Sequence, residues 1–299
     1  MRSIGIDIGK TNIKWVTLDP SGAAIAREEI PTPKDVHIID VVRSIVQEDV
    51  DTSGGEATCL GLASPGLASK DSRMIACLPG GQPAIEGIDW TELLAWPMTV
   101  PILNDANAAL FAEAKSGAAA GYQHVFMLTL GTGIGGAMMI EGRLVHGRTG
   151  KAGHLGHISI HPDWPKSLLG MPGSLEYAFG DRSVAERSGG RFHSNKDLAT
   201  ALSSDDILAT KLWHDGIRHL ARGIVSLTNV LDPDIVVIGG GVTEAGEMLF
   251  KPLRDAVAEL EWCPTGEPVP IVPAKLGPHA GAIGAALYAK QICETMAGE

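Results

Sequence analysis

The chain has 299 residues, of which 44% are hydrophobic and 20% charged, a balance that supports a buried core and excludes a disordered chain. This length suits two domains rather than one. Its 24 Lys and Arg residues against 35 Asp and Glu residues give a net charge of −11. That charge argues against nucleic acid or an anionic membrane as the main partner, because both attract positive surfaces, but it allows a locally positive pocket for a phosphate ligand.

Four widely separated cysteines form no CxxC pair: Cys59, Cys77, Cys263 and Cys293. This pattern excludes a disulfide scaffold and an ordinary cysteine zinc motif, and is typical of the reducing cytoplasm. No apolar run approaches the ~18 residues that a membrane span needs. An acid at Asp7 also excludes a signal peptide at the N-terminus. We therefore expect a cytoplasmic protein.

Short apolar runs bounded by turn residues predict strands in the first part of the chain. They cover residues 4–8, 13–19, 59–63 and 100–103. Apolar residues at helical spacing predict a helix over 36–47, and an alanine-rich run predicts one over 106–115.

A second strand–glycine turn–strand unit follows the first at 4–18. The strand at 125–130 ends in the glycine run 131–136 and continues into a hairpin that turns at Glu141 and Gly142. We interpret the two units as a duplicated architecture. The remaining predicted elements are helices at 217–231, 244–260 and 280–296 and a strand at 235–238. The fold class is α/β, in two lobes.

The glycine runs are candidate phosphate cradles. Glycines at 131–136 let successive backbone N–H groups approach an anion; the alternative is a tight hairpin turn. A dinucleotide fingerprint is disfavoured because these glycines lead into a strand, not a helix. A third glycine turn, at 239–241, also follows a predicted strand.

The first turn adds the side chains that a phosphoryl site needs. Asp7 can hold Mg²⁺ through water, Thr11 and the turn backbone can bind phosphate oxygens, and Lys14 supplies positive charge. The alternative is an ordinary hairpin with a salt-bridged Lys14. The three glycine turns together predict ATP held between two related lobes. The Walker A pattern is absent, so the chain is not a P-loop enzyme.

Asn104 and Asp105 end a predicted strand just before a helix. A carboxylate there can take the proton from an attacking hydroxyl, while the amide holds a second hydroxyl of a polyol. The alternative is that the pair only caps the helix.

Three histidines follow at 154, 157 and 161. A zinc site is one interpretation, but Gly156 and Pro162 argue against one helix presenting all three rings. We favour polar ligand contacts from His154 and His157. Glu176 comes after a glycine- and proline-containing loop and can bind ligand or form a surface salt bridge.

An ordered set of motifs spans nearly the whole chain. It comprises DIGKTNIK at 7–14, SPG at 64–66, LPG at 78–80, NDANAA at 104–109, LGTGIGG at 130–136, GHLGH at 153–157, DPDIVVIGGG at 232–241 and AGAIGAA at 280–286. This set resembles the ROK family of bacterial sugar kinases, within the hexokinase and actin-like ATPase superfamily.

The resemblance implies a two-lobed actin-like ATPase (ribonuclease H-like) fold with a central cleft that closes on sugar. It implies a smaller lobe at 1–105, completed by the C-terminal helix at about 281–299, and a larger lobe at 106–280. The implied activity is that of an ATP- and Mg²⁺-dependent hexose kinase. The family suggests a homodimer formed through the larger lobe.

The resemblance makes Asp105 the catalytic base and places phosphate contacts in 5–12 and 131–138. Six residues are predicted to contact the sugar: Ser64, Gly66, Asn104, His154, His157 and Glu176. Predicted ATP contacts come from Gly9, Lys10, Thr11, Asn12, Lys14, Gly131, Thr132, Gly133, Gly135, Gly240 and Gly241. Asp7 is the predicted Mg²⁺ residue.

Three departures from the family pattern affect these expectations. Lys10 replaces a second turn glycine, and either adds a phosphate contact or points to solvent. His154 replaces a glutamate that reaches a sugar hydroxyl near the anomeric centre, which puts the sugar preference in question. Ser167, Leu169 and Ser174 occupy the places of three zinc-binding cysteines, so we expect no zinc site.

Two other functions compete with a sugar kinase. A sugar-responsive repressor is disfavoured by the charge of −11 and by a first strand that begins within a few residues of the start. A catalytically weak sugar-binding or regulatory protein is suggested by Lys10 and His154, and disfavoured by Asp105 and the glycine turns.

Overall fold

The computed structural model describes residues 1–33, 37–52, 58–79, 83–167, 169–264 and 266–297. The chain forms two compact units. Unit 1 comprises residues 1–120, 146–152 and 276–299, and unit 2 comprises residues 121–145 and 153–275. Among the described residues, no helix combines the length and apolar character that crossing a bilayer requires.

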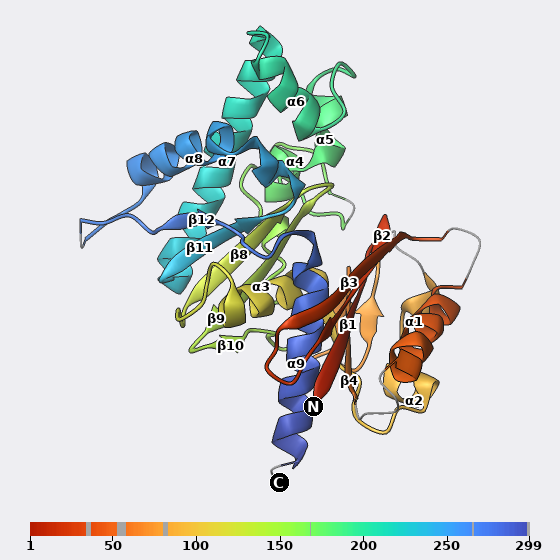
Figure 1. The fold of residues 1–299 in the computed structure, drawn as a ribbon. Helices are drawn as coiled ribbons and strands as arrows, with labels where there is room; N and C mark the ends of the chain where they lie inside the picture. The colour runs from red at the N-terminus through yellow and green to blue at the C-terminus, as the bar shows by residue number, and fades with distance from the viewer. Residues whose placement is uncertain (34–36, 53–57, 80–82, 168, 265, 298–299) are drawn as a thin grey trace. The chain divides into compact units, whose positions relative to one another are not determined.

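Unit 1 is built on a five-stranded sheet in the order β3-β2-β1-β4-β7 (Figure 1). Its strands are β1 (Arg2–Ile8), β2 (Asn12–Leu18), β3 (Ala24–Pro31), β4 (Thr58–Ser64) and β7 (Ile102–Asn104). β1 to β3 form an antiparallel meander, whereas β1, β4 and β7 run parallel. The helices of this unit are α1 (Ile38–Thr52), α2 (Trp90–Leu94), α3 (Asp105–Ser116) and α9 (Ala280–Ala297).

The alternation of side chains along β1 directs its two faces to different helices. Ile4 and Ile6 are buried in one core cluster with apolar residues of α1. Gly5 faces α9, where a Cβ would lie 1.9 Å from the carbonyl oxygen of Ala282. A side chain at Gly5 would therefore push α9 off the sheet. Asp7, two residues later, shares the α9 face.

The crossing of α3 and α9 depends on Gly284. A Cβ at this position would lie 1.8 Å from the carbonyl oxygen of Ala108, a backbone atom that cannot move by itself. We expect Gly284→Ala to lower the free energy of unfolding by roughly 1–3 kcal/mol, the usual cost of overpacking. Denaturant unfolding measures this, with the exposed α9 substitution Gln291→Ala as control. Equal stability of the two variants would contradict the close crossing.

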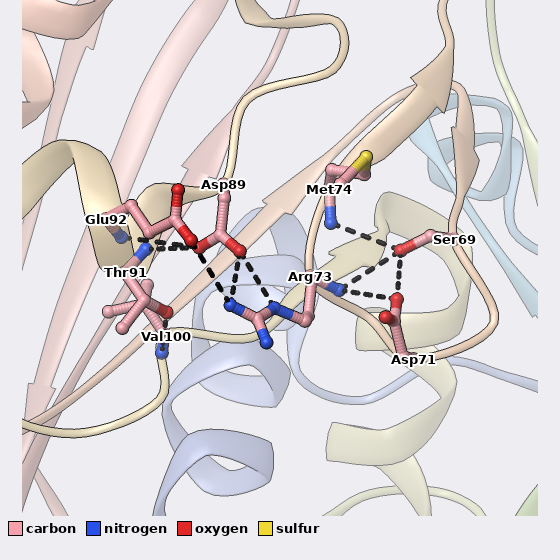
Figure 2. Close-up of polar contacts among 8 residues, drawn as sticks. All are labelled: Ser69, Asp71, Arg73, Met74, Asp89, Thr91, Glu92 and Val100. Carbon is pink, nitrogen blue, oxygen red and sulfur yellow. Dashed lines mark hydrogen bonds and ion pairs between the residues drawn. The ribbon is translucent and has the colours of Figure 1, made fainter.

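The β5–β6 hairpin follows the end of β4 and is fixed to α2. Its strands are Leu67–Ala68 and Ile75–Cys77. Figure 2 shows Arg73 of this hairpin donating from Nε to Asp89 Oδ2 over 2.8 Å. The other oxygen of Asp89 accepts from the backbone N–H groups of Thr91 and Glu92 and so caps α2. One carboxylate thus joins two elements.

Unit 2 repeats the sheet of unit 1, in the order β10-β9-β8-β11-β12. Its strands are β8 (Val125–Leu130), β9 (Ile134–Ile140), β10 (Arg143–Leu144), β11 (Ile235–Gly239) and β12 (Ile271–Pro273). Again the first three strands along the chain form an antiparallel meander and β8, β11 and β12 run parallel. The duplicated architecture predicted from 4–18 and 125–145 is confirmed.

The helices of unit 2 bury the larger of the two cores. They are α4 (Leu175–Phe179), α5 (Asp181–Arg187), α6 (Asn195–Leu202), α7 (Ile207–Leu231) and α8 (Glu247–Leu260). Phe179 and Trp213 are fully buried in this core, with ring centroids 5.4 Å apart. Asp232 ends α7 in a left-handed conformation, φ 42°, at the predicted position.

Several predicted boundaries are wrong. β3 was missed because nearly all its side chains are exposed and the strand shows no apolar alternation. The helix predicted over 36–47 is α1, which begins at Ile38 and ends at Thr52; residue 36 lies outside the described residues. α8 begins at Glu247 rather than 244, because Gly246, φ 56°, interrupts the backbone.

The first stretch of unit 1 ends at Ala120, and unit 2 begins at Gly121. The lobe boundary expected at residue 105 stays a prediction. α3 belongs to unit 1 because it packs on α9. Residues 146–152 also return to unit 1, where Gly150 lies against the backbone of Ala68. The division into a smaller and a larger lobe stays a prediction.

Candidate active site

The parallel strands of unit 1 bring the predicted catalytic residues to one edge of the sheet. Asp7 of β1 is in register with Ala63 of β4, and Ser64 at the end of β4 is in register with Asn104 of β7. The carboxyl ends of the three strands therefore lie side by side, the position at which open α/β sheets bind ligands. Strand pairing alone thus brings Asp7 and Asn104, about a hundred residues apart in the sequence, to the same end of the sheet.

Asn104 and Asp105 have different roles in starting α3. Asn104 is the N-cap: its Oδ1 accepts from the N–H groups of Ala106 and Asn107, at 3.0 and 3.3 Å. Its Nδ2 donates to the carbonyl of Gly66 over 3.0 Å. The capping interpretation thus holds for Asn104. Asp105 is the first helical residue, and its Oδ1 accepts from Ala106 N over 2.8 Å.

Both carboxylates at this edge hold protons more tightly than a carboxylate in water. Burial, assisted by the negative charge of Asp105, raises the pKa of Asp7 to about 7, and Lys14 opposes the rise. Lys14 is the cross-strand neighbour of Asp7 in the β1–β2 hairpin. Burial also raises the pKa of Asp105, against the hydrogen bonds from Ala106 and Asn104. Two acids of raised pKa at one strand edge are typical of functional sites.

Gly281, which the sequence did not indicate as a site residue, shapes the environment of Asp7. A Cβ at Gly281 would lie 2.6 Å from Asp7 Oδ2, so the first turn of α9 rests on this carboxyl group. The signal was present in the glycine-alanine run at 280–286, which the sequence marked as a helix and as one of the family motifs but not as a neighbour of Asp7.

The turn from β1 to β2 exposes its predicted phosphate residues. Lys10 and Thr11 are exposed, and Asn12 begins β2. Thr32 holds the turn: its Oγ1 donates to the carbonyl of Gly9 over 2.7 Å, and its N–H donates to that of Thr11 over 2.8 Å. The turn is thereby fixed while Lys10 remains free to reach an anion or solvent.

Ser64 and Gly66 shape the turn after β4. Ser64 is fully buried, and its hydroxyl donates to the carbonyl of Pro65 over 3.1 Å. Gly66 has φ 103°, and a Cβ there would lie 2.7 Å from the carbonyl oxygen of Cys77. Only glycine fits this backbone, whose carbonyl receives the amide of Asn104.

In unit 2 the two remaining glycine turns also lie side by side. β8 and β11 are parallel neighbours, with Gly239 in register with Thr129. The turn beginning at Gly131 therefore lies beside Gly240, whose Cβ would meet Leu130 O at 2.2 Å. α5 braces the first turn: Asp181 N–H donates to the carbonyl of Gly131 over 3.0 Å.

At two positions of this edge, neither the surrounding protein nor the backbone conformation requires a glycine. A Cβ at Gly131 or at Gly241 would meet no described atom within 4 Å, and neither residue has a positive φ. Gly133 differs, because a Cβ there would lie 2.1 Å from Glu176 Oε2. Open space where side chains are missing suits a ligand lying directly on the backbone.

Glu176 lies at the glycine turn. It is the second residue of α4, and its Oε2 accepts from the N–H of Ile134 over 3.2 Å. Its carboxylate thus occupies a backbone donor of the predicted phosphate cradle. Glu176 forms no surface salt bridge among the described residues.

His154 and His157 lie on a short 3-10 turn (Leu155–His157), with nearly parallel rings whose centroids are 6.3 Å apart. His154 Nε2 and His157 Nδ1 are buried and have no hydrogen-bond partner among the described residues. Burial, assisted by the neighbouring His157, lowers the pKa of His154. The imidazole of His154 is therefore neutral at pH 7, with one donor and one acceptor to offer a ligand.

The described residues contain no group of three or more His, Cys, Asp or Glu side chains placed to hold a metal ion. The ring of His161 stacks on Trp164, with centroids 4.7 Å apart. The Ser174 hydroxyl accepts from the N–H of Tyr177 and caps α4. The absence of a zinc site stays a prediction.

The repeated five-stranded order and the paired strand-edge sites define the class of protein: an α/β actin-like ATPase fold of the ribonuclease H-like type. Within that class the chain belongs to the ROK family, whose model matches residues 3–292.

Named relatives match over almost their whole length. The glucokinase of Thermotoga maritima is 30% identical, over 97% of this chain and 98% of the relative. The ROK hexokinase structure from Thermus thermophilus is 31% identical with a TM-score of 0.83, covering 99% and 100%. A Streptomyces griseus ROK glucokinase, solved with glucose and AMPPNP, is 25% identical with a TM-score of 0.79, covering 97% and 100%.

The family is not uniform in activity. An Escherichia coli N-acetylmannosamine kinase is 30% identical, over 97% of this chain and 99% of the relative. The xylose repressor of Bacillus subtilis is 24% identical, over 94% of this chain and 75% of the relative. Membership therefore implies kinship with sugar kinases and with sugar-responsive repressors.

Proposed function

We propose that this protein is an ATP-dependent sugar kinase that transfers the γ-phosphate of ATP to a hydroxyl of a hexose or hexose derivative. The observation that carries the proposal is the placement of Asp105. It is the first residue of α3, at the strand edge that also presents Asp7, with a raised pKa. Kinship with named glucokinases and a hexokinase supports the same activity.

Asp105 is the proposed general base. Its carboxylate accepts the proton of the sugar hydroxyl as that oxygen attacks the γ-phosphorus. The raised pKa makes Asp105 a better proton acceptor than an ordinary aspartate, while the bond from Ala106 N to Oδ1 fixes the carboxylate. Asn104 holds the start of α3 and the turn at Gly66, so it orients the base as well as lining the sugar site.

Asp7 is the proposed Mg²⁺ residue, acting through water. Its donor chemistry fits, because a hard cation prefers carboxylate oxygen and the second charge of Asp105 raises the local affinity for positive charge. Bound Mg²⁺ would neutralise charge that develops on the phosphates. Lys14 supplies a fixed positive charge opposite Asp7.

The glycine turns are the proposed ATP site. Gly131 and Gly241 leave open space over the backbone, which supports a nucleotide lying there, and Thr132, Gly133, Gly135 and Gly240 belong to the same two turns. In unit 1 we propose Gly9, Lys10, Thr11 and Asn12 for the phosphates. The relative solved with AMPPNP supports ATP as the donor.

The nitrogens His154 Nε2 and His157 Nδ1 are buried with no hydrogen-bond partner in the described part of the chain, which supports sugar binding there, because sugar hydroxyls would satisfy them. Ser64 and Gly66 contribute through the turn that Asn104 holds. Glu176 is proposed to contact the sugar as well, and it also holds Ile134 N of the glycine turn.

A coupled ADP-release assay over hexoses, amino sugars and N-acyl sugars tests the proposal. We expect Mg²⁺-dependent turnover of at least one sugar with ATP. Sugar binding without turnover would instead identify a regulatory protein. This alternative is tested because a xylose repressor is among the relatives.

We expect the purified protein to contain no stoichiometric zinc. His157 is not joined by thiols, and His161 is engaged with Trp164. Activity should survive a zinc-selective chelator and be lost on Mg²⁺ removal. Elemental analysis is the direct measurement, and about one zinc per chain would contradict the expectation.

We expect His154→Ala to change the ranking of sugars or raise the KM for sugar, with the KM for ATP nearly unchanged. The neutral ring presents Nε2 to the ligand, and alanine cannot replace it. The acid limb of the kcat/KM profile should also shift. His154→Glu, which restores the family residue, should change the ranking differently. An unchanged sugar profile with an unchanged acid limb in His154→Ala would leave His154 a packing residue.

A further inference from the structure

Trp164 is the centre of an aromatic cluster in unit 2. Its ring stacks on His161, with centroids 4.7 Å apart and an interplanar angle of 7°. It meets Tyr177 at 5.4 Å and 51°, and the edge of His219 at 4.5 Å and 77°. The indole is partly buried and packs against the core.

These contacts join three parts of the chain. His161 and Trp164 lie in the irregular segment 158–174, Tyr177 lies on α4, and His219 lies on α7. The segment forms bonds of its own: Lys166 and Pro172 make an isolated β-bridge, and Ser167 N–H donates to the carbonyl of Met171 over 2.8 Å. These bonds stay within the segment, whereas the ring contacts of Trp164 join it to α4 and α7. Arg222 lies beside His219, with Nη1 3.4 Å from Nδ1.

The ends of the segment are tied to each other. Ile160 N–H donates to the carbonyl of Gly173 over 2.8 Å, and Leu175 N–H donates to that of Ile158 over 2.9 Å. Gly173, φ 61°, is required because a Cβ would lie 1.5 Å from His161 O. The segment is therefore a loop with a closed stem, and His161 lies where the stem passes into the Trp164 cluster.

The stem emerges from two residues of the proposed sugar site. His157 precedes Ile158, and Glu176 follows Leu175, so both are adjacent to the stem hydrogen bond that joins these residues. Movement of the stem would move the imidazole and the carboxylate together. We propose that Trp164 is a positioning residue for sugar binding: its stack on His161 and its edge contact with His219 fix the stem and thereby the placement of His157 and Glu176. This inference rests on the proposed function for its effect on catalysis.

The positioning role predicts a split between kinetic constants. We expect Trp164→Leu to raise the KM for the preferred hexose of the panel about tenfold, because leucine fills space without stacking. The KM for ATP should stay within about twofold, since Gly131 and Gly241 lie in the turns that follow β8 and β11 rather than on the segment. Trp164→Phe should restore most of the sugar affinity by restoring a stacking ring.

Trp262→Leu is the matched control. Trp262 is 75% exposed in the same unit and makes none of the ring contacts found among the described residues. The control variant should keep the wild-type KM for sugar. Should Trp164→Leu fail to fold, His219→Ala provides the same comparison with a smaller rise in the KM for sugar: it removes the ring contact with Trp164, together with the exposed contact to Arg222, and leaves the Trp164–His161 stack in place.

Hydrogen exchange makes the test independent of activity. The amides of Ile160 and Leu175, the stem donors, should exchange at least tenfold faster in Trp164→Leu than in wild type, and at the wild-type rate in Trp262→Leu. Unchanged exchange, or a sugar KM in Trp164→Leu equal to that of the control, overturns the inference. A wild-type protein that turns over no sugar overturns the proposed function instead, and the exchange comparison still decides whether Trp164 fixes the stem.

Discussion

Asp105→Asn should lower kcat by ~10²–10⁴ while sugar affinity changes little, the range expected when a general base is lost. Asparagine keeps the shape of the side chain, and its Oδ1 can still accept from Ala106 N. It cannot accept the proton of the attacking hydroxyl. Steady-state kinetics with isothermal calorimetry of sugar binding separates these two effects.

Asp255→Asn is a control for the loss of one carboxylate. Asp255 lies on α8, is mostly exposed, and pairs only with Lys251 among the described ion pairs. This variant should keep wild-type kinetics. An Asp105→Asn enzyme that retained most of its kcat would remove Asp105 from the role of base.

Asp7→Asn should make the protein more stable and less active. The pKa of Asp7 is about 7 in the folded chain, against 3.8 as its ordinary value. The folded state therefore keeps a proton that the unfolded state has lost, and ionising Asp7 opposes folding. This cost in folding free energy grows as pH rises from about 4 to about 7 and stays constant at higher pH. It amounts to ~1.4 kcal/mol for each unit by which the pKa is raised on folding.

Asparagine carries no charge and avoids this cost. Denaturant unfolding without Mg²⁺ or nucleotide measures this. The free energy of unfolding of Asp7→Asn should exceed that of wild type by a few kcal/mol at pH 8, and the difference should shrink toward zero near pH 4. If the difference in free energy of unfolding did not depend on pH, the folded chain would not raise the pKa of Asp7. In turnover, we expect kcat to fall roughly 10²-fold or more, because the proposed Mg²⁺ residue is lost.

Much of the sheet architecture could be predicted from local patterns. Apolar runs that end at a glycine turn or at Ser64-Pro65-Gly66 located β1, β4, β8 and β11, and the repeat of strand, glycine turn and strand indicated the duplication that both sheet orders confirm. β3 escaped because an exposed edge strand needs no apolar pattern: its backbone bonds to β2 hold it. The short helices α4 to α6 escaped because caps and core contacts stabilise them more than helix propensity does.

Some features of the candidate site could be predicted from the sequence, and others could not. Residue types at Asp7, Asn104 and Asp105 already indicated their chemistry, because a strand end before a turn or helix limits what a carboxylate can do there. The sequence did not show that Asn104 is the helix cap and Asp105 the first helical residue. The distinction depends on which of the two residues has the extended backbone conformation of a cap, and both Asn and Asp can adopt it.

By itself the sequence determined the α/β class, the glycine turns and the family resemblance, since these depend on neighbours within a few residues. Only the tertiary structure decided that Gly281 rests on Asp7, that burial lowers the pKa of His154, and that Trp164 contacts two helices from a loop. Proton affinity and ring stacking depend on which distant groups exclude water from a side chain. Those groups are brought together only when strands and helices pair across the fold.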